Sequence, residues 1–181
     1  MKHTACALAA LIALSACASN STQSTDTTVA AGTTAQEEGD MLAIGTAAPA
    51  FTTKDNTGNT VSIADYKGAK NVVLVFYPGN NTPVCTAQLC EIRDEFANFE
   101  AKDTVVFGVN DASVESHAKF AGKNEFPFPL LVDADGKITS AYGSRGLLGI
   151  TKRTVYGIDK NGVIVFAERG RPSPDKVLAA F

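Results

Sequence analysis

The sequence predicts an α/β protein in which a central mixed sheet is covered by helices on both faces. Residues 72–77 form a continuous apolar run rich in β-branched and aromatic side chains, which is typical of a strand buried on both faces. This strand begins an alternation of strand, helix, strand and helix that predicts a parallel βαβ unit. Residues 159–162, with the sequence Asp-Lys-Asn-Gly, predict a hairpin, so an antiparallel pair of strands joins the parallel unit.

The individual elements follow from apolar periodicity, caps and turn residues. Apolar residues recur at steps of three and four after Pro83, which predicts a helix with one buried stripe, and Ser113 is a suitable N-cap for a second helix. Ser173 followed by Pro174 marks the start of a last helix, which we expect to stop at Phe181. In chain order we expect an opening segment at residues 43–51, a hairpin with a short helix or turn at 55–68, strand 72–77, helix 83–100, strand 104–110, helix 113–123, strand 130–132, an acidic turn at 133–136, a Gly-rich loop at 142–151, strands 152–158 and 163–168, and the last helix.

The first residues differ in composition from the rest and predict export. Lys2 precedes a short apolar run, the pattern of a secretory signal peptide, which we place at residues 1–16. The Leu-Ser-Ala-Cys that ends this region resembles the bacterial lipobox, so Cys17 is the expected lipid-attachment residue. The alternative is an ordinary signal peptide that is cut near Ala16 or Ala18.

The remainder divides into a tether and a folded domain. Residues 17–40 comprise the lipidated cysteine and a flexible Ser/Thr-rich tether with too few apolar residues to bury a core. Residues 41–181 have a globular composition and no stretch of about twenty apolar residues that would predict a membrane-spanning helix. A lipid on Cys17 implies a protein anchored in the cell envelope and facing the periplasm. Ala18, rather than an acidic residue, follows the cysteine and favours the outer membrane.

Composition argues against several classes of function. The net charge is −3 and the basic residues form no patch, so nucleic-acid binding is not expected. His117, the one histidine after the signal peptide, is expected on the surface of the second helix, and two remaining cysteines do not complete a zinc shell with it. No metal or cofactor is therefore expected. Arg93 and Asp94 are interpreted as a structural ion pair.

The residues around Cys85 indicate nucleophilic chemistry. Pro78 ends the first strand, while Thr82 is the expected N-cap of the helix and Pro83 its first residue, which places Cys85 in the first turn. There the unpaired backbone N–H groups and the positive end of the helix macrodipole favour a thiolate, the reactive form of cysteine. The alternative is that Cys85 is a small buried core residue. The buried stripe below it is expected to comprise Leu89, Ile92, Phe96 and Phe99.

The spacing of these residues resembles a known signature. Pro78, Thr82 and Cys85 stand at the spacing of the active-site motif of the peroxiredoxins, and Cys90, five positions after Cys85, resembles the bacterioferritin-comigratory (PrxQ) branch. Arg153 stands in a predicted strand where that family has its active-site arginine. The resemblance covers nearly all of the predicted domain and implies a thioredoxin-like three-layer fold.

The resemblance implies a thiol-dependent peroxidase without a cofactor, acting on hydrogen peroxide or organic hydroperoxides. Cys85 would attack the peroxide and become a sulfenic acid, and Cys90 would resolve it as an intramolecular disulfide. Thr82 and Arg153, with backbone N–H groups around Cys85, would stabilise the charge on the leaving oxygen. A thioredoxin-like dithiol protein is the implied reductant. A monomer is expected because the sequence has no C-terminal arm beyond Phe181, and relatives that build large rings use such an extension.

Two other functions stay open at this point. A thiol–disulfide oxidoreductase acting on protein disulfides would use the same fold, but such enzymes resemble C-x-x-C, whereas four residues separate Cys85 from Cys90. A non-catalytic thioredoxin-like binding module of the envelope would not need a reactive thiol. Substitution of Cys85 distinguishes this module from the enzymes.

Overall fold

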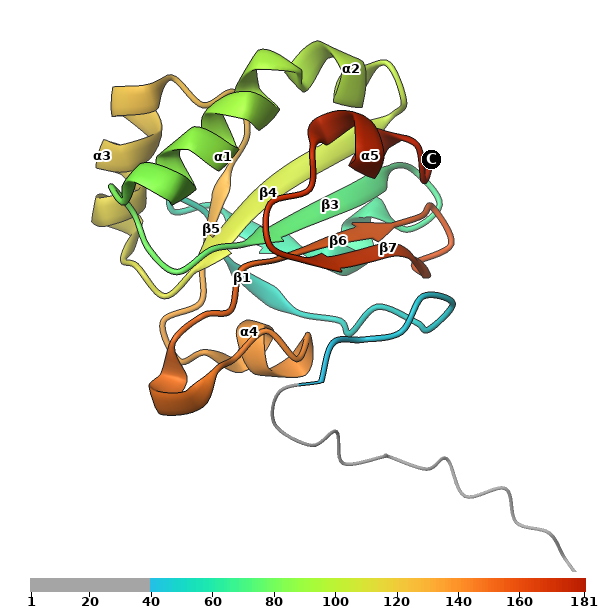
Figure 1. Ribbon diagram of the computed structural model, residues 1–181, viewed down its shortest axis with the longest axis horizontal. Helices are drawn as coiled ribbons and strands as arrows, with labels where there is room; N and C mark the ends of the chain where they lie inside the picture. Colours follow the sequence, from blue (N-terminus) through green and yellow to red (C-terminus); the bar gives the residue numbers. More distant parts are fainter. Residues whose placement is uncertain (1–39) are drawn as a thin grey trace, which may run out of the picture. The chain divides into compact units, whose positions relative to one another are not determined.

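The computed structural model describes residues 40–181 of the 181-residue chain, and all of these belong to one compact unit. The predicted signal peptide at residues 1–16, Cys17 and the tether up to residue 39 lie outside the described residues. Figure 1 shows the helices and strands around a central sheet. In chain order they are β1 (Thr52–Lys54), β2 (Thr60–Ser62), η1 (Ile63–Tyr66), β3 (Asn71–Phe76), α1 (Pro83–Asp94), α2 (Phe96–Glu100), β4 (Thr104–Asn110), α3 (Val114–Asn124), β5 (Leu130–Val132), α4 (Lys137–Ala141), η2 (Leu147–Gly149), β6 (Thr154–Ile158), β7 (Ile164–Arg169) and α5 (Pro174–Leu178).

A five-stranded sheet with the order β5-β4-β3-β6-β7 forms the centre of the fold. Strand β3 lies in the middle, parallel to β4 and antiparallel to β6, and β4 pairs in parallel with β5. The β6–β7 hairpin turns at the predicted residues, where Asp159 Oδ1 accepts hydrogen bonds from Asn161 N and Val163 N at 2.9 Å each. The predicted mixed sheet is therefore confirmed.

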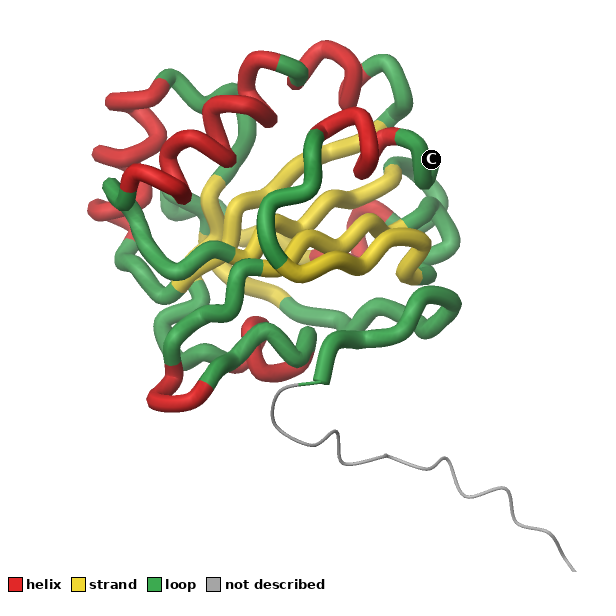
Figure 2. The backbone as a smooth tube through the Cα atoms, viewed as in Figure 1, coloured by secondary structure: helices red, strands yellow, loops and turns green. Residues whose placement is uncertain are grey.

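Helices lie on both faces of the sheet, as the sequence predicts. Alternate residues of β3 point to opposite sides, so Val73 and Val75 join one core and Leu74 and Phe76 join the other. The first core is closed by α1, α2, α3 and α5, which Figure 1 shows together above the sheet, and the second by η1 and α4. In Figure 2 the helices, in red, flank the yellow strands. Strand β3 is consequently buried along almost its whole length.

Two helices end earlier than the sequence predicts. The expected helix 83–100 is two helices, α1 and α2, because Glu95 leaves the helical region at φ −102° and ψ 11°. The buried stripe continues across this break, since Phe99 is 1 % exposed and Phe96 packs against the same core. Helix α5 ends at Leu178, and Phe181 packs on the first core instead of extending the helix.

Helix α4 is an element that the sequence analysis did not anticipate. Asp133, the first residue of the acidic turn, is buried, and its carboxylate accepts hydrogen bonds from Ile138 N at 2.9 Å and Thr139 N at 2.7 Å. Gly136 supplies the left-handed backbone, at φ 68°, that leads into the helix. The acidic run is a turn, as predicted, but its first carboxylate also satisfies the N–H groups at a helix start.

Within residues 40–181, no helix has the length and apolar character that crossing a membrane requires. The same residues contain no group of three or more His, Cys, Asp or Glu side chains that could hold a metal ion.

Candidate active site

The register of the sheet brings Arg153 to Cys85. Helix α1 follows the carboxyl end of β3, so Cys85 in its first turn lies at that end of the strand. Strand β6 is antiparallel to β3, and Thr154 at its start pairs with Phe76 at the end of β3. Arg153 lies just before β6, one residue outside the strand in which the sequence analysis placed it. It therefore faces the loop that leads to Cys85, although 68 positions separate the two residues.

The thiol of Cys85 is enclosed and is contacted by a cation. Cys85 is 1 % exposed, and Arg153 donates a hydrogen bond from Nη2 to its Sγ at 3.0 Å. The second terminal nitrogen of the guanidinium, Nη1, donates to Oε1 of Gln88, which is also 1 % exposed. The bond to Gln88 keeps the guanidinium turned toward the sulfur. Its charge is thus fixed where it stabilises a thiolate or a developing oxyanion.

Gln88 is a site residue that the sequence analysis missed. It stands three positions after Cys85 and therefore on the same face of α1. Its amide nitrogen Nε2 is buried and has no hydrogen-bond partner among the described residues. A polar residue one helical turn from a reactive cysteine, on a face that is otherwise apolar, was the signal available in the sequence.

Thr82 occupies the predicted N-cap position of α1, but its side chain does not cap the helix. Its hydroxyl points back into the loop and donates to the carbonyl oxygen of Gly79 at a long 3.5 Å. The helix start is closed by backbone alone, with Thr86 N bonded to Thr82 O at 2.9 Å. The prediction of a side-chain cap is therefore wrong. Thr82 is exposed, so its hydroxyl stays accessible to a substrate.

Asn80 ties the loop before α1 to three other elements. Its Oδ1 accepts hydrogen bonds from Tyr77 OH at 2.9 Å and from Asn110 Nδ2 at 3.1 Å. Its Nδ2 donates to Ser116 Oγ in α3 at 3.0 Å. From the sequence alone Asn80 is a turn former, because nothing local shows that Tyr77 after β3, the end of β4 and helix α3 converge on its amide. This amide fixes the loop that carries Thr82.

His117 is buried, and the prediction that it lies on the surface of the second helix is wrong. It is 0 % exposed and shares the inner face of α3 with Phe120 and Ala121, at the i+3 and i+4 positions. A polar side chain such as His117 is expected on the outer face of a helix. The helical spacing of Phe120 and Ala121, however, places His117 on the inner face.

Burial favours the uncharged form of two groups behind the loop. It lowers the pKa of His117, an effect that the backbone carbonyl groups of Asn110 and Leu131 oppose. It also raises the pKa of Tyr77 well above the ordinary value, and the nearby Cys85 adds to this effect through charge repulsion. Tyr77 OH lies 3.4 Å from His117 Nδ1. The two side chains therefore form a neutral support for the loop.

Cys90 shares α1 with Cys85, and the two thiols are free. Five residues along an α-helix give a Cα separation of about 8 to 9 Å, beyond the roughly 7 Å that a disulfide spans. Cys90 is partly exposed, whereas Cys85 is buried. The intact helix keeps the thiols apart, so a bond between them requires part of α1 to unwind.

Arg93 and Asp94 form the structural ion pair that the sequence suggests. Their nearest charged atoms are 2.8 Å apart, and Arg93 Nη1 also donates to the carbonyl oxygen of Asn124 at 2.8 Å. The pair therefore connects α1 to the end of α3 and takes no part in the site.

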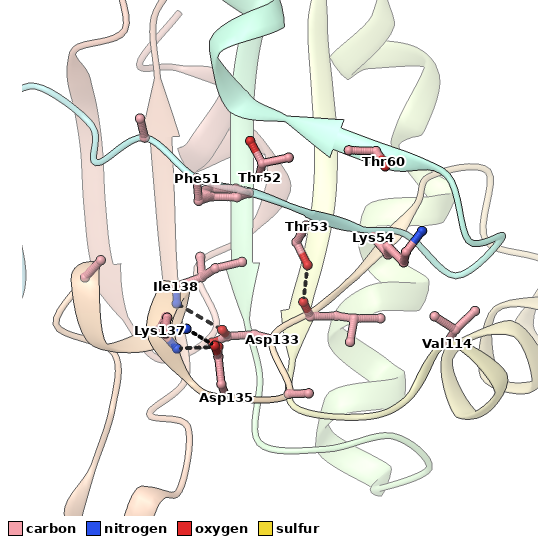
Figure 3. Close-up of a pocket in the computed structure, with 14 residues that line it drawn as sticks. Phe51, Thr52, Thr53, Lys54, Thr60, Val114, Asp133, Asp135, Lys137 and Ile138 are labelled. Atoms are coloured by element: carbon pink, nitrogen blue, oxygen red, sulfur yellow. Dashed lines mark hydrogen bonds and ion pairs between the residues drawn. The ribbon is translucent and has the colours of Figure 1, made fainter.

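A wide pocket of about 780 Å³ lies between β1 and the turn from β5 into α4, as Figure 3 shows. Two of its polar side chains are engaged within the fold, because Thr53 Oγ1 donates to Val132 O and Asp133 accepts from the start of α4. Neither Cys85 nor Arg153 lines this pocket. It therefore offers no thiol, and the candidate site is the enclosed sulfur of Cys85.

Comparison with known proteins finds relatives of most of the described chain. The AhpC/TSA family pattern matches residues 44–167. Peroxiredoxin Bcp of Bacillus subtilis (strain 168) is 39 % identical over 147 residues, covering 77 % of this chain and 92 % of the relative. The chloroplastic peroxiredoxin Q of Sedum lineare is 40 % identical over 134 residues, covering 73 % of this chain and 72 % of the relative. The crystal structure of peroxidoxin BcpB from Mycobacterium tuberculosis matches with a TM-score of 0.71 at 33 % identity, over 76 % of this chain and 94 % of that one. The predicted thioredoxin-like fold is confirmed by this match.

Proposed function

Because the chain belongs to the AhpC/TSA family of thiol-dependent peroxidases, we propose that Cys85 attacks the hydroperoxide and that Cys90 resolves the oxidised form. The observation that carries this proposal is the 3.0 Å hydrogen bond from Arg153 Nη2 to Cys85 Sγ. It places a fixed cation on a buried thiol at the start of a helix, where the N–H groups also point toward negative charge.

In the first step the Cys85 thiolate attacks one oxygen of a hydroperoxide, ROOH. A sulfur–oxygen bond forms, the oxygen–oxygen bond breaks, and RO⁻ leaves and takes a proton from solvent to give ROH. Cys85 becomes a sulfenic acid. Arg153 and the N–H groups of the first turn stabilise the charge that develops on the oxygens, and the Thr82 hydroxyl donates to the bound peroxide.

In the second step the Cys90 thiolate attacks the sulfur of the Cys85 sulfenic acid. A disulfide forms, and the displaced hydroxide takes a proton and leaves as water. A thioredoxin-like dithiol protein then reduces the disulfide and becomes a disulfide itself, which restores both thiols. No cofactor enters the cycle.

Burial of Cys85 argues against the rival thiol–disulfide oxidoreductase. A protein disulfide brings its own backbone to the attacking sulfur, whereas Cys85 is 1 % exposed and lies against Arg153. A hydroperoxide brings only an oxygen–oxygen group to the sulfur and therefore needs far less room than a protein disulfide. Peroxide reduction is therefore the better-supported chemistry.

Single-turnover reaction with hydrogen peroxide tests the roles of the two thiols. The chain from residue 18 onward is suitable, because both cores consist of residues between 42 and 181. Cys85→Ser should consume no peroxide, whereas Cys90→Ser should consume one equivalent and leave a sulfenic acid that dimedone traps on Cys85. The proposal is wrong if Cys85→Ser reacts at the wild-type rate, or if Cys90→Ser turns over with thioredoxin as fast as wild type.

We further propose that the protein is anchored by a lipid on Cys17 and faces the periplasm from a cell-envelope membrane, with Ala18 favouring the outer membrane. The support is the Leu-Ser-Ala-Cys sequence and the Ser- and Thr-rich stretch after it. The full chain should incorporate labelled palmitate and sediment with membranes, and Cys17→Ala should do neither. Recovery of the wild type entirely in the soluble envelope fraction would contradict this anchor.

A further inference from the structure

An apolar loop adjoins the active site. Six large apolar side chains are exposed in residues 40–181, and three of them lie together at Leu147, Leu148 and Ile150, which are 89 %, 91 % and 60 % exposed. A fourth, Val84, is 55 % exposed and is the neighbour of Cys85 in the sequence. Isolated apolar side chains are ordinary on protein surfaces, but a cluster of almost fully exposed leucines marks a contact surface.

The loop is a small hairpin that is fixed to the catalytic arginine. Gly146 N bonds Ile150 O at 2.7 Å, and the tip is the short helix η2 (Leu147–Gly149). Leu148 adopts a left-handed backbone at φ 61°, a conformation that leucine rarely takes. Arg153 follows the hairpin after only two residues. The apolar tip therefore lies close to Arg153 along the chain.

Basic residues flank the apolar tip, and acidic residues are absent from this part of the sequence. Between Asp135 and Asp159 there is no Asp or Glu. The same stretch contains four basic residues, of which Lys137 is paired with Asp135 and Arg153 bonds to Cys85 and Gln88. The other two, Arg145 and Lys152, are the nearest of these to the tip. An apolar tip between cations has the composition of a segment that enters the headgroup region of an anionic membrane.

The described chain begins beside this loop. The backbone of Asp40 lies so close to Gly143 that a Cβ atom on Gly143 would be 1.8 Å from Asp40 O. Figure 1 shows the blue start of the described chain next to α4, from which the orange loop continues. Met41 and Ile44, the other two exposed large apolar side chains, follow Asp40 directly. An attachment to a membrane through the preceding residues would reach the domain on this side.

We propose that residues 144–152 dock onto an anionic lipid surface. Leu147 and Leu148 enter the headgroup region, while Arg145 and Lys152 contact lipid phosphates. The docked loop holds Arg153, which contacts the Cys85 thiol, next to the membrane. This binding goes beyond the proposed peroxidase function and does not depend on it.

Vesicle flotation tests the proposal with the chain from residue 18, which lacks Cys17 and hence any lipid. Wild type should float with vesicles of equal parts phosphatidylcholine and phosphatidylglycerol, and less with phosphatidylcholine alone. The double change Leu147→Gln and Leu148→Asn should lower the bound fraction roughly ten-fold or more, because it removes two apolar side chains from the tip. Asparagine accepts the left-handed backbone better than leucine, so this variant keeps the loop conformation.

A matched pair of charge changes controls for nonspecific attraction. Lys152→Ser and Lys123→Ser each remove one exposed cation, the first at the end of the loop and the second on α3. Only Lys152→Ser should weaken binding to the anionic vesicles by several-fold.

Three results would overturn the proposal. Wild type could remain unfloated with anionic vesicles, or the double variant could float as well as wild type. Sedimentation velocity without vesicles provides the third: a wild-type dimer that the double variant converts to monomer would make the loop an interface between copies. Flotation uses no peroxide, so a failure of the proposed peroxidase function leaves its outcome unchanged.

Discussion

Arg153 Nη2 donates a hydrogen bond to Cys85 Sγ at 3.0 Å, while Nη1 of the same guanidinium donates to Gln88 Oε1. Both acceptors belong to α1 and stand one helical turn apart. The cation is therefore aligned by the same helix that carries the reactive thiol. Any movement of this part of α1 changes the position of the sulfur and the anchoring of the arginine together.

Arg153→Lys should slow the reaction of Cys85 with hydrogen peroxide roughly a hundred- to a thousand-fold, the usual loss when one donor to a developing oxyanion is removed. An ammonium group keeps the charge but cannot bond the sulfur and Gln88 at once, as the guanidinium fork does. Stopped-flow measurement of sulfenic acid formation gives the rate. Arg171→Lys is the matched control, because Arg171 pairs with Glu91 on the surface. A wild-type rate in Arg153→Lys would remove the arginine from the mechanism.

Gln88 should act as a positioning residue for Arg153. Gln88→Leu fills a similar volume without an acceptor, so the guanidinium loses one of its two fixed points, and attack on peroxide should slow roughly ten-fold at unchanged thermal stability. Gln88→Glu restores an acceptor for Nη1 and should recover most of that loss. The comparison of the two attack rates is decisive. Equal rates in the Leu and Glu variants would show that the buried amide only fills space.

Elements with a strong local signal were predictable from the sequence. Strands 104–110 and 130–132 coincide with β4 and β5, because apolar runs bounded by turn residues mark such strands without reference to the rest of the chain. The caps Ser113 and Ser173 are likewise local, and each side chain accepts a hydrogen bond from the helix that it precedes. The position of Cys85 in the first turn of α1 followed from the same reasoning.

The polar contacts behind the site could not be predicted in this way. Asn80 becomes a structural residue only when β3, β4 and α3 meet, and His117 becomes a core residue only when α3 packs its inner face. Asp133 similarly acquires its role when the chain turns into α4. Each depends on partners from distant segments, which residue type and local spacing do not reveal.

The protein should lose stability as the pH falls below the ordinary pKa of histidine. Burial lowers the pKa of His117 from 6.5, so below that pH the unfolded chain binds more protons than the folded one. The contribution of His117 to the free energy of unfolding is fully present above about pH 6.5. It is lost as the pH falls toward the lower pKa that His117 has in the folded protein. Urea denaturation of the chain from residue 18, whose only histidine is His117, measures this loss. The free energy of unfolding of His117→Gln should lack this loss at low pH. Parallel pH profiles for wild type and His117→Gln would show that His117 is not its source.

Oxidation should unwind the first turns of α1. Cys85 and Cys90 are about 8 to 9 Å apart at Cα in an intact helix, and a disulfide spans roughly 7 Å at most, so the bond cannot form on the helix as it stands. The helix start is suited to opening, because Thr82 provides no side-chain cap, whereas Ile92 and Phe99 remain buried in the core below. Hydrogen exchange should therefore show lost protection across residues 82–93 after one equivalent of peroxide, with β4 unchanged. Cys90→Ser, which cannot form the disulfide, is the control and should keep its protection. Equal exchange in the reduced and oxidised wild type would refute the unwinding and require another route for resolving the sulfenic acid.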